Sequence, residues 1–552
     1  MLNVHRARPT VSAEALILLT AGFVVCFDNI AFWRVVLDDR SWHAASTWSY
    51  AFGVLLVLIA VYYLILSLLA TRALLKPVLI FVLLAGSVVT YYISQYNVVF
   101  DSSMVRNVLH TDAHEAAELL STGLLWTVLL LGVVPSVAVI LVNVRRRSWR
   151  RAVSLWVITS AAALVIAVGA LLTVFQDVAP MVRNHREVRY LVTPLNLFVA
   201  AARAMRFDIG AAVASADPLV TVTRAPAASN ARPTLFVLVV GETARAANFS
   251  LNGYARDTNP GLSQVDIINF SHTRSCGTST EVSLPCMFSP FGRRAYDQSR
   301  IAQHESLVQQ VARAGIRVVW RDNQSGCKGV CTGVEVQSFE RVELPRVCDG
   351  GRCHDEVLLH DLDKLTLNAP RDTMLVLHQI GNHGPAYYRR YPPAFKHFTP
   401  ACETDALHTC TQQQIVNAYD NALRYTDHVL VKLIEFLQTQ RSTYDVALIY
   451  VSDHGESLGE NGLYLHGMPY AIAPREQLEV PMIWWLSPEF ARNRSIDVEC
   501  LRARASSETS HDHLFHSISG VFDLTSADRD PRWDLFASCR HDLARQGLAA
   551  TR

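Results

Sequence analysis

Long uncharged apolar runs fill roughly the first third of the 552-residue chain and are absent from the rest. Five runs are long enough to cross about 30 Å of hydrocarbon as helices: residues 13–35, 51–70, 77–98, 123–144 and 152–175. The first run is too long, and too closely followed by others, to be a cleaved signal peptide. The pattern therefore predicts a domain of five transmembrane helices over residues 1–177.

The loops between these runs alternate in charge. Basic residues without acids precede the first run and separate the second from the third and the fourth from the fifth, where Arg145, Arg146 and Arg147 lie. The other two loops carry acids. By the positive-inside rule, the N-terminus is expected in the cytoplasm and everything after about Phe175 outside it.

Two polar features interrupt the apolar domain. Asp28 and Asn29 fall late in the first run. They are either a solvated pair at the outer interface, which is the simpler interpretation, or they face a polar partner or a wet cavity. The loop 101–122 runs into an acidic, alanine-rich helix. This loop is either a solvated connection or a site for a lipid headgroup that uses Asn107 and Glu115.

After residue 207 the pattern changes to short aliphatic runs that alternate with helical segments. Strand-like runs cover residues 235–240, 316–320, 374–377 and 446–451, and helical segments include 302–314 and 413–440. This alternation predicts an α/β domain over residues 233–552. Residues 178–232 are expected to form a helix at the membrane surface followed by a linker.

The net charge of +1 conceals two unlike halves. Residues 1–207 carry 17 Lys and Arg against 10 Asp and Glu, whereas residues 208–552 carry 33 against 39. Half of all residues are hydrophobic, as expected when a membrane domain is joined to an ordinary water-soluble fold. This composition excludes a disordered or collagen-like chain and a strongly basic nucleic-acid-binding protein.

Ten of the eleven cysteines lie beyond residue 270, close together in pairs, and Cys26 lies in the first apolar run. In an exported domain such a set predicts disulfides. Zinc ribbons are the alternative, but the chain lacks two CxxC units. Proximity in the sequence indicates the pairs Cys276–Cys286, Cys327–Cys331, Cys348–Cys353, Cys402–Cys410 and Cys500–Cys539.

Polar residues follow predicted strands directly, at the edge where open α/β sheets bind ligands. Glu242 comes after the run 235–240, and Asp453 and His454 come after the run 446–451. Two carboxylates and an imidazole suit a divalent metal that still lacks a fourth ligand. A hydroxyl beside such a metal loses its proton more readily, so a threonine of the segment 276–286 is a candidate nucleophile.

Other candidate groups are imidazoles and an ammonium: His378, His383, His466 and Lys328. Each one alone is more often structural than functional. Several histidines that follow strand ends, together with a lysine able to pair with phosphate oxygens, indicate a phosphate-binding pocket and a phosphoryl-type transfer.

Seven motifs in five segments occur together with the five apolar runs: GETAR at 241–245, SCGTST and SLPCMFS within 275–289, WRDN and KGV within 320–330, HGPAYYRRYP at 383–392 and SDHGESLGENGLYLHG at 452–467. This set resembles the lipid A phosphoethanolamine transferases over nearly the whole chain. The resemblance implies an alkaline phosphatase/sulfatase-like α/β domain with a central, mostly parallel sheet. It also implies zinc ligands, which are Glu242, Thr280, Asp453 and His454, with Thr280 as the nucleophile.

The resemblance implies further roles. His383, His466 and Lys328 would hold the phosphoethanolamine group or a second zinc, and one of the two histidines would move a proton. Asn107 and Glu115 would bind lipid. The donor would be phosphatidylethanolamine, the acceptor a phosphate of lipid A, and the products would include diacylglycerol. The enzyme would be a multi-pass monomer of the Gram-negative inner membrane, with a periplasmic catalytic domain, and would confer resistance to cationic peptides such as polymyxin.

Two positions depart from the family pattern. Glu281 follows the expected nucleophile where relatives usually have a small residue, and Asn382 precedes His383 where serine is usual. Neither departure replaces an expected ligand. A carboxylate beside the nucleophile would nevertheless change the local charge.

Four other functions compete with this interpretation. A transferase of phosphoethanolamine to another envelope glycan and a phosphoglycerol transferase of the lipoteichoic acid type would have the same architecture. A sulfatase is disfavoured because Cys276 is followed by Gly-Thr-Ser instead of the Cys-x-Pro-x-Arg motif of sulfatases. A receptor or scaffold that keeps the fold without chemistry is disfavoured because the four expected ligands are intact.

Overall fold

The computed structural model describes residues 9–540 except 39, 70, 72, 112, 214–218, 226–231, 340–341, 343, 346, 350–351 and 368–370. For residues 113–115, 186, 209–213, 349 and 367 it describes the backbone alone. The chain forms two compact units. The first comprises residues 1–105 and 120–203, and the second comprises residues 106–119 and 204–552.

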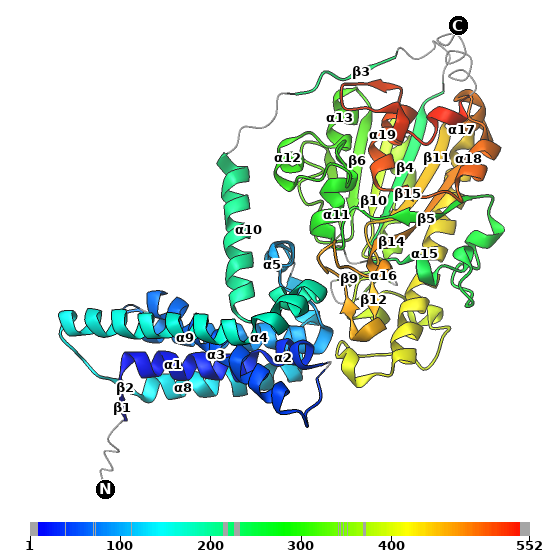
Figure 1. The fold of residues 1–552 in the computed structure, drawn as a ribbon. Helices are drawn as coiled ribbons and strands as arrows, with labels where there is room; N and C mark the ends of the chain where they lie inside the picture. Colours follow the sequence, from blue (N-terminus) through cyan, green and yellow to red (C-terminus); the bar gives the residue numbers. More distant parts are fainter. Residues whose placement is uncertain are drawn as a thin grey trace, which may run out of the picture. The chain divides into compact units, whose positions relative to one another are not determined.

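Apolar helices build the first unit (Figure 1). Among the described residues, four helices are long and apolar enough to cross a membrane: α3 (Ala45–Leu69), α4 (Leu75–Tyr96), the stretch Thr122–Leu141 and α9 (Trp149–Asn184). The stretch joins α7 (Thr122–Thr127), a π-helical segment (Val128–Val133) and α8 (Val134–Leu141). These four helices correspond to the last four predicted runs.

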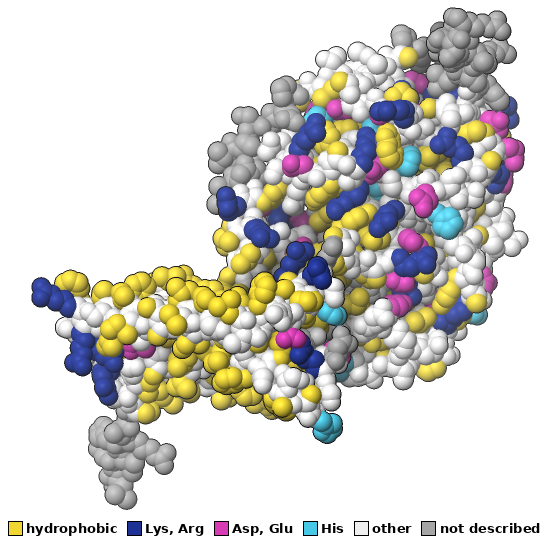
Figure 2. Space-filling model, in the orientation of Figure 1, with side chains coloured by type: hydrophobic (Ala, Val, Ile, Leu, Met, Phe, Trp, Pro, Cys, Tyr) yellow, Lys and Arg dark blue, Asp and Glu magenta, His cyan; other side chains and the backbone are white. Residues whose placement is uncertain are grey.

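The first predicted run is bent. It contains α1 (Ala13–Phe23), a π-helical segment (Val24–Asp28) and α2 (Ile30–Leu37), and its two parts meet at 63°. The described residues therefore contain four helices that could span a membrane, or five if the bent pair crosses as one. Apolar side chains cover much of the face of this unit that Figure 2 shows.

Asn29, at the bend, is buried and bonded to backbone groups. Its amide donates to the carbonyls of Val24 and Thr193 at 2.9 and 2.8 Å, and its carbonyl accepts from the Thr193 amide at 2.8 Å. Asp28 is also buried. The interpretation of this pair as solvated at an interface is therefore wrong, because Asn29 satisfies backbone groups inside the helix bundle.

The loop 101–122 forms two short helices, α5 (Ser102–Leu109) and α6 (Ala113–Glu118). Glu118 is only 3% exposed, and its carboxylate pairs with Arg390 at 2.5 Å and with Arg352. The expectation of a solvated connection is wrong for Glu118, because two arginines bury and neutralise it. These contacts explain why residues 106–119 belong to the second unit.

The second unit contains an eight-stranded sheet in the order β15-β5-β14-β11-β4-β10-β6-β7. Its strands are β4 (Thr234–Gly241), β5 (Ile268–Arg274), β6 (Arg317–Asp322), β7 (Glu335–Ser338), β10 (Thr373–His378), β11 (Asp445–Ser452), β14 (Glu479–Leu486) and β15 (Thr509–Ser510). The run from β11 to β7 is parallel, and β14 is antiparallel to both neighbours. The four predicted strands and the mostly parallel sheet are confirmed.

Helices cover both faces of this sheet because its side chains alternate between them. Phe236, Leu238 and Val240 of β4 pack in one core with α11 (Thr280–Met287), α13 (Leu307–Arg313) and α19 (Asp512–Val521). Leu235 lies on the other face, beside α14 (Leu362–Leu367) and α15 (Gln412–Thr439).

Two helices were predicted in this unit, with different outcomes. The helix expected over 413–440 is confirmed as α15. The helix expected over 302–314 is instead two helices, α12 (Gln298–Gln303) and α13, because Ser306 caps the second one in a capping box with Gln309.

All five predicted disulfides are present in the second unit: Cys276–Cys286, Cys327–Cys331, Cys348–Cys353, Cys402–Cys410 and Cys500–Cys539. Residues 178–232 contain the end of α9, then α10 (Leu195–Val213) and β3 (Thr223–Arg224). Since β3 pairs with β16 (Leu524–Thr525), part of the expected linker is bound to the second unit.

Candidate active site and metal centre

Neighbouring parallel strands bring the predicted metal ligands together. β4 and β11 pair in register, with Ser452 opposite Gly241, so Glu242 and the pair Asp453 and His454 leave the sheet side by side. Steric crowding favours glycine at position 241, because a Cβ there would lie 2.6 Å from the Tyr450 hydroxyl. All three candidate ligands are fully buried.

The ligand atoms of Glu242, Asp453 and His454 lie within 4.8 Å of one another. Glu242 Oε1 and Asp453 Oδ2 lie 3.2 and 3.4 Å from His454 Nε2, and neither oxygen has a hydrogen-bond partner among the described residues. Buried carboxylates grouped in this way suit a bound cation. Two carboxylates and one imidazole fit zinc.

The protonation of these groups also favours a bound cation. Burial and the neighbouring Glu242 carboxylate raise the pKa of Asp453 to about 7. Burial would lower the pKa of His454, but the carboxylates of Asp453 and Glu242 outweigh it and raise this pKa to about 10. Without a cation the cluster therefore holds a proton that a divalent ion would displace.

Thr280 supplies a fourth donor. It begins α11, and its Oγ1 lies 3.0 Å from Glu242 Oε2 and 3.5 Å from His454 Nε2. The side chain is nearly buried, so water competes little for the hydroxyl. The positive end of the helix dipole also favours negative charge at this position.

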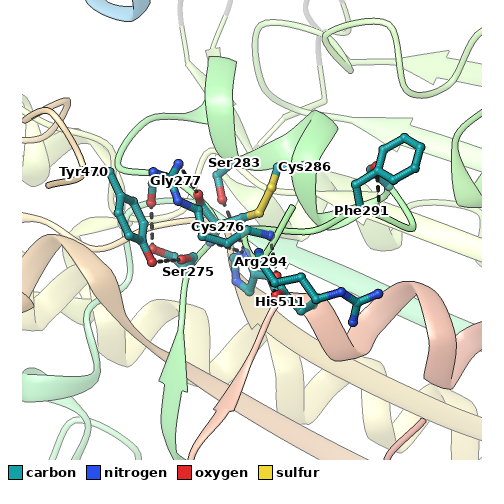
Figure 3. Close-up of a disulfide and its surroundings, with 12 residues drawn as sticks. Ser275, Cys276, Gly277, Ser283, Cys286, Phe291, Arg294, Tyr470 and His511 are labelled. Carbon is teal, nitrogen blue, oxygen red and sulfur yellow. Dashed lines mark hydrogen bonds between the residues drawn. A yellow bond between two sulfur atoms is a disulfide. The ribbon is translucent and has the colours of Figure 1, made fainter. Parts of the chain in front are cut away.

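A disulfide and a histidine hold the segment that carries Thr280 (Figure 3). Cys276 and Cys286 close the segment, and His511 Nδ1 accepts from the Cys276 amide at 3.1 Å. His511 Nε2 donates to the carbonyl of Ser452, at the end of β11, at 3.0 Å. Burial lowers the pKa of His511 to about 3, so the ring is neutral and connects the nucleophile segment to the strand that carries Asp453.

His383 and His466 lie beside the ligand cluster. The ring centroid of His466 is 4.5 Å from that of His454 and 5.3 Å from that of His383. His466 Nδ1 lies 2.8 Å from Glu456 Oε2, which orients the ring. The carbonyl of His383 accepts from Arg390 Nε at 2.7 Å. The structure thus brings both predicted histidines to the metal ligands.

Lys328 lies on the loop closed by the disulfide Cys327–Cys331. Its Nζ donates to Ser325 Oγ at 2.9 Å and to the Ser325 carbonyl at 3.2 Å. Between the end of β6 and this loop, Gln324 Nε2 donates to Glu242 Oε2 at 2.9 Å. The segment that leads into the loop is therefore bonded to the ligand cluster through Gln324, a residue that the sequence motifs did not identify.

The predicted lipid-binding residues lie on α5 and α6. Asn107 is partly exposed on α5, whereas the side chain of Glu115 on α6 lies outside the described residues. Near Asn107, Arg106 and His110 pair with Glu281 at 2.8 and 3.0 Å. Glu281, the residue beside the candidate nucleophile, is only 5% exposed. Through its ion pairs with Arg106 and His110, it holds the segment that carries Asn107.

The other departure, Asn382, is fully buried in a structural position. Its backbone amide donates to the Glu242 carbonyl at 3.0 Å, and its side chain donates to the Tyr419 carbonyl at 3.2 Å. The first bond places the turn before His383 against the strand end that carries Glu242, and the second holds the turn to α15.

His378 is a buried imidazole at the end of β10. Its Nδ1 lies 2.6 Å from Asp322 Oδ1, and its Nε2 has no hydrogen-bond partner among the described residues. A carboxylate that fixes one ring nitrogen leaves the other available to a ligand. In the sequence, His378 is one of several candidate histidines that follow strand ends, whereas no motif marks His511.

Two carboxylates, an imidazole and a threonine at the carboxyl edge of a mostly parallel sheet define a sulfatase-like α/β domain with a candidate metal centre. Residues 234–524 match the Sulfatase family, and residues 58–208 match the family described as Phosphoethanolamine transferase EptA/EptB.

Full-length relatives extend this result. The chain is 37% identical over 549 residues to phosphoethanolamine transferase EptA of Escherichia coli K12, covering 98% of this chain and 99% of the relative. It is 35% identical over 531 residues to phosphatidylethanolamine transferase Mcr-1 of Escherichia coli, covering 94% and 96%. The chain belongs to the phosphoethanolamine transferase family, and the resemblance predicted from its motifs is confirmed.

A solved structure supports the assignment. The integral membrane protein lipooligosaccharide phosphoethanolamine transferase A (EptA) from Neisseria meningitidis matches with a TM-score of 0.92 and 37% identity. The match covers 96% of this chain and 99% of that one. An apolar helical domain followed by a sulfatase-like domain is therefore the architecture of this family member.

Proposed function

We propose that this protein transfers phosphoethanolamine from phosphatidylethanolamine to a phosphate of lipid A. The observation that carries the proposal is the position of Thr280 Oγ1, 3.0 Å from Glu242 in a buried set of metal-ligand atoms. Similarity over the whole chain to phosphoethanolamine transferases supports the transferred group. The lipooligosaccharide substrate of the structural relative supports the acceptor.

Glu242, Thr280, Asp453 and His454 would hold one zinc ion. Bound zinc would lower the pKa of the threonine hydroxyl and balance charge on the phosphoryl oxygens. Thr280 Oγ attacks the phosphorus of the donor, the bond from phosphorus to the diacylglycerol oxygen breaks, and phosphoethanolamine remains on Thr280. A phosphate oxygen of lipid A then attacks the same phosphorus, and the bond to Thr280 breaks.

The neighbouring groups handle protons and orientation. His383 or His466 protonates the diacylglycerol oxygen as it leaves. Glu456 at 2.8 Å from His466 Nδ1 supports this role for His466, because it leaves Nε2 for the substrate. Lys328 pairs with phosphate oxygens, and a second zinc would bind near the two histidines.

The remaining parts of the proposal concern the membrane. Asn107 and Glu115 bind lipid, and the protein acts as a monomer. Five spans with a cytoplasmic N-terminus, counting the bent pair as one, place the second unit in the periplasm of a Gram-negative cell. An added ammonium makes the lipid A phosphate less anionic, so the cell resists cationic peptides such as polymyxin.

Mass spectrometry tests the proposal directly. Cells that express the protein should contain lipid A with one added phosphoethanolamine, and Thr280→Ala should abolish the addition. Intact-mass analysis of protein incubated with donor alone should find phosphoethanolamine on Thr280.

Thr280→Ser is the matched control, because it keeps a hydroxyl and should keep measurable transfer. Normal modification of lipid A by Thr280→Ala would contradict the mechanism. If a different glycan received the phosphoethanolamine, that glycan would be the acceptor instead of lipid A.

A further inference from the structure

A cavity of about 1260 Å³ lies in the first unit. Part of its wall is apolar, formed by Ile17, Leu68, Val153 and Trp156. Another part is cationic, formed by Lys76, Arg145, Arg146 and Arg147. Figure 2 shows Lys and Arg side chains gathered at one end of this unit, next to its apolar flank.

The arginine segment is held by the N-terminal part of the chain. β1 (Thr10–Val11) and β2 (Asn143–Val144) form a parallel pair. The Asn143 amide donates to the Pro9 carbonyl at 2.9 Å, and the Arg145 amide donates to the Val11 carbonyl at 3.0 Å. The cationic wall is therefore an ordered part of the unit.

Most of the polar groups around the cavity already have partners. Arg147 donates to both carboxylate oxygens of Glu14 at 2.8 Å. Lys76 Nζ donates to the carbonyls of Ile140 and Val142, at 2.8 and 2.6 Å, at the end of α8. Each bond uses a charge that would otherwise be available to a ligand.

Two charges remain. Within the part of the chain that the structure describes, the side chains of Arg145 and Arg146 form no hydrogen bond or ion pair. Glu14 is the one acid among the described lining residues, and Arg147 already neutralises it. The cavity thus combines two available guanidinium groups with an apolar wall.

We propose that this cavity binds a phospholipid with a net negative charge. Its phosphate lies against Arg145 and Arg146, and an acyl chain lies along the apolar wall, because guanidinium groups bind phosphate strongly. A zwitterionic phospholipid fits less well, since its ammonium would meet two guanidinium groups and no available carboxylate. The site lies wholly in the first unit and takes a lipid of a different charge from the proposed donor.

The test uses the full-length protein in detergent and native mass spectrometry. Phosphatidylglycerol and phosphatidylethanolamine are added stepwise, and bound lipid is counted. Phosphatidylglycerol is expected to bind at least about tenfold more tightly, since a surface arginine contributes about a factor of five to binding of an anionic lipid. Arg145→Gln/Arg146→Gln should weaken its binding by a similar factor.

Arg150→Gln/Arg151→Gln is the matched control. It removes the same charge from the same basic segment, but these two arginines do not line the cavity. Binding in this control should change less than about twofold. Equal losses in both double variants would overturn the proposal, since they would indicate a general effect of surface charge.

Two further results would overturn it. Equal affinity for the two phospholipids would remove the charge preference, and this comparison needs no variant that has to fold. Displacement of the lipid by millimolar inorganic phosphate would indicate a site for a free anion, whereas retention of the lipid is expected.

Discussion

The two units differ in where their apolar and polar side chains lie. In the first unit, large apolar side chains face outward, as Leu172 does at 72% exposure, and the polar Asn29 is buried and bonded to backbone. In the second unit, the central strands β4, β10 and β11 are buried on both faces, and Glu242 and Asp453 are each buried with an oxygen that accepts no hydrogen bond among the described residues. An outward apolar surface suits hydrocarbon, whereas two neighbouring buried carboxylates beside an imidazole suit a bound cation. A buried polar side chain has a structural role where backbone groups satisfy it, as they satisfy Asn29.

The largest effect should follow the loss of a carboxylate in the second unit. Glu242→Gln removes one of the two anions of the candidate centre, so bound zinc should be lost and transfer should fall by roughly a thousandfold. Metal analysis and mass spectrometry of lipid A measure both. Glu489→Gln, which changes a carboxylate paired with Arg441 away from the site, should have no effect. Full zinc content in Glu242→Gln would contradict the metal assignment.

A smaller effect is expected at Glu281, beside the candidate nucleophile. Glu281→Ala leaves Arg106 and His110 without the carboxylate that holds them, so kcat/KM should fall by about 10- to 100-fold. Zinc content should not change, because Glu281 is not one of the candidate ligands. The measurement is lipid transfer by purified protein.

A double-mutant cycle separates this pairing from general damage. Arg106→Gln removes the partner at 2.8 Å, and its effect should largely disappear in the Glu281→Ala background. Additive losses would mean that the two side chains act independently.

In the first unit, Asn29→Ala should lower stability without changing the chemistry. The substitution leaves backbone groups of Val24 and Thr193 unsatisfied, which costs about 1–3 kcal/mol. Thermal unfolding in detergent measures the loss, and transfer per folded molecule should stay within about twofold. Cys26→Ala, at an exposed side chain in the π-helical segment that precedes Asn29, should change neither quantity. A large loss of zinc in Asn29→Ala would contradict the expectation that this residue of the first unit affects stability and not the candidate metal centre.

The smallest expected effect is a loss of stability at low pH. Burial lowers the pKa of His511 to about 3 from an ordinary value of 6.5, so below about pH 6 the unfolded chain binds a proton that the folded chain does not. Stability should therefore fall with the pH, by about 1.4 kcal/mol per unit for one such group. Denaturant unfolding at pH 7 and pH 5 measures this slope.

The slope should be smaller in His511→Gln but not zero, because burial also lowers the pKa of His516 to about 4. An unchanged slope in the variant would mean that His511 does not contribute.

Features that depend on neighbouring residues could be read from the sequence. Apolar runs predict the spanning helices, and aliphatic runs predict the central strands. The disulfides were predictable because each cysteine pairs with one close to it in sequence, at separations of 4 to 39 residues. Glu242, Asp453 and His454 were predictable as a cluster because parallel strands present their carboxyl ends at one edge of the sheet.

Tertiary structure alone decided the contacts between distant residues. Asn29 bonds to Thr193 across 164 positions, His110 pairs with Glu281 across 171, and Cys276 donates to His511 across 235. Periodicity and local motifs carry no information on such pairs, because the folded chain chooses them by packing and by the need to satisfy buried polar groups. By itself, the sequence determined the apolar helices, the central strands and the residue types of the candidate ligand cluster. The bend at Asn29, the partners of Glu281 and the neutral His511 became evident only when distant segments were packed together.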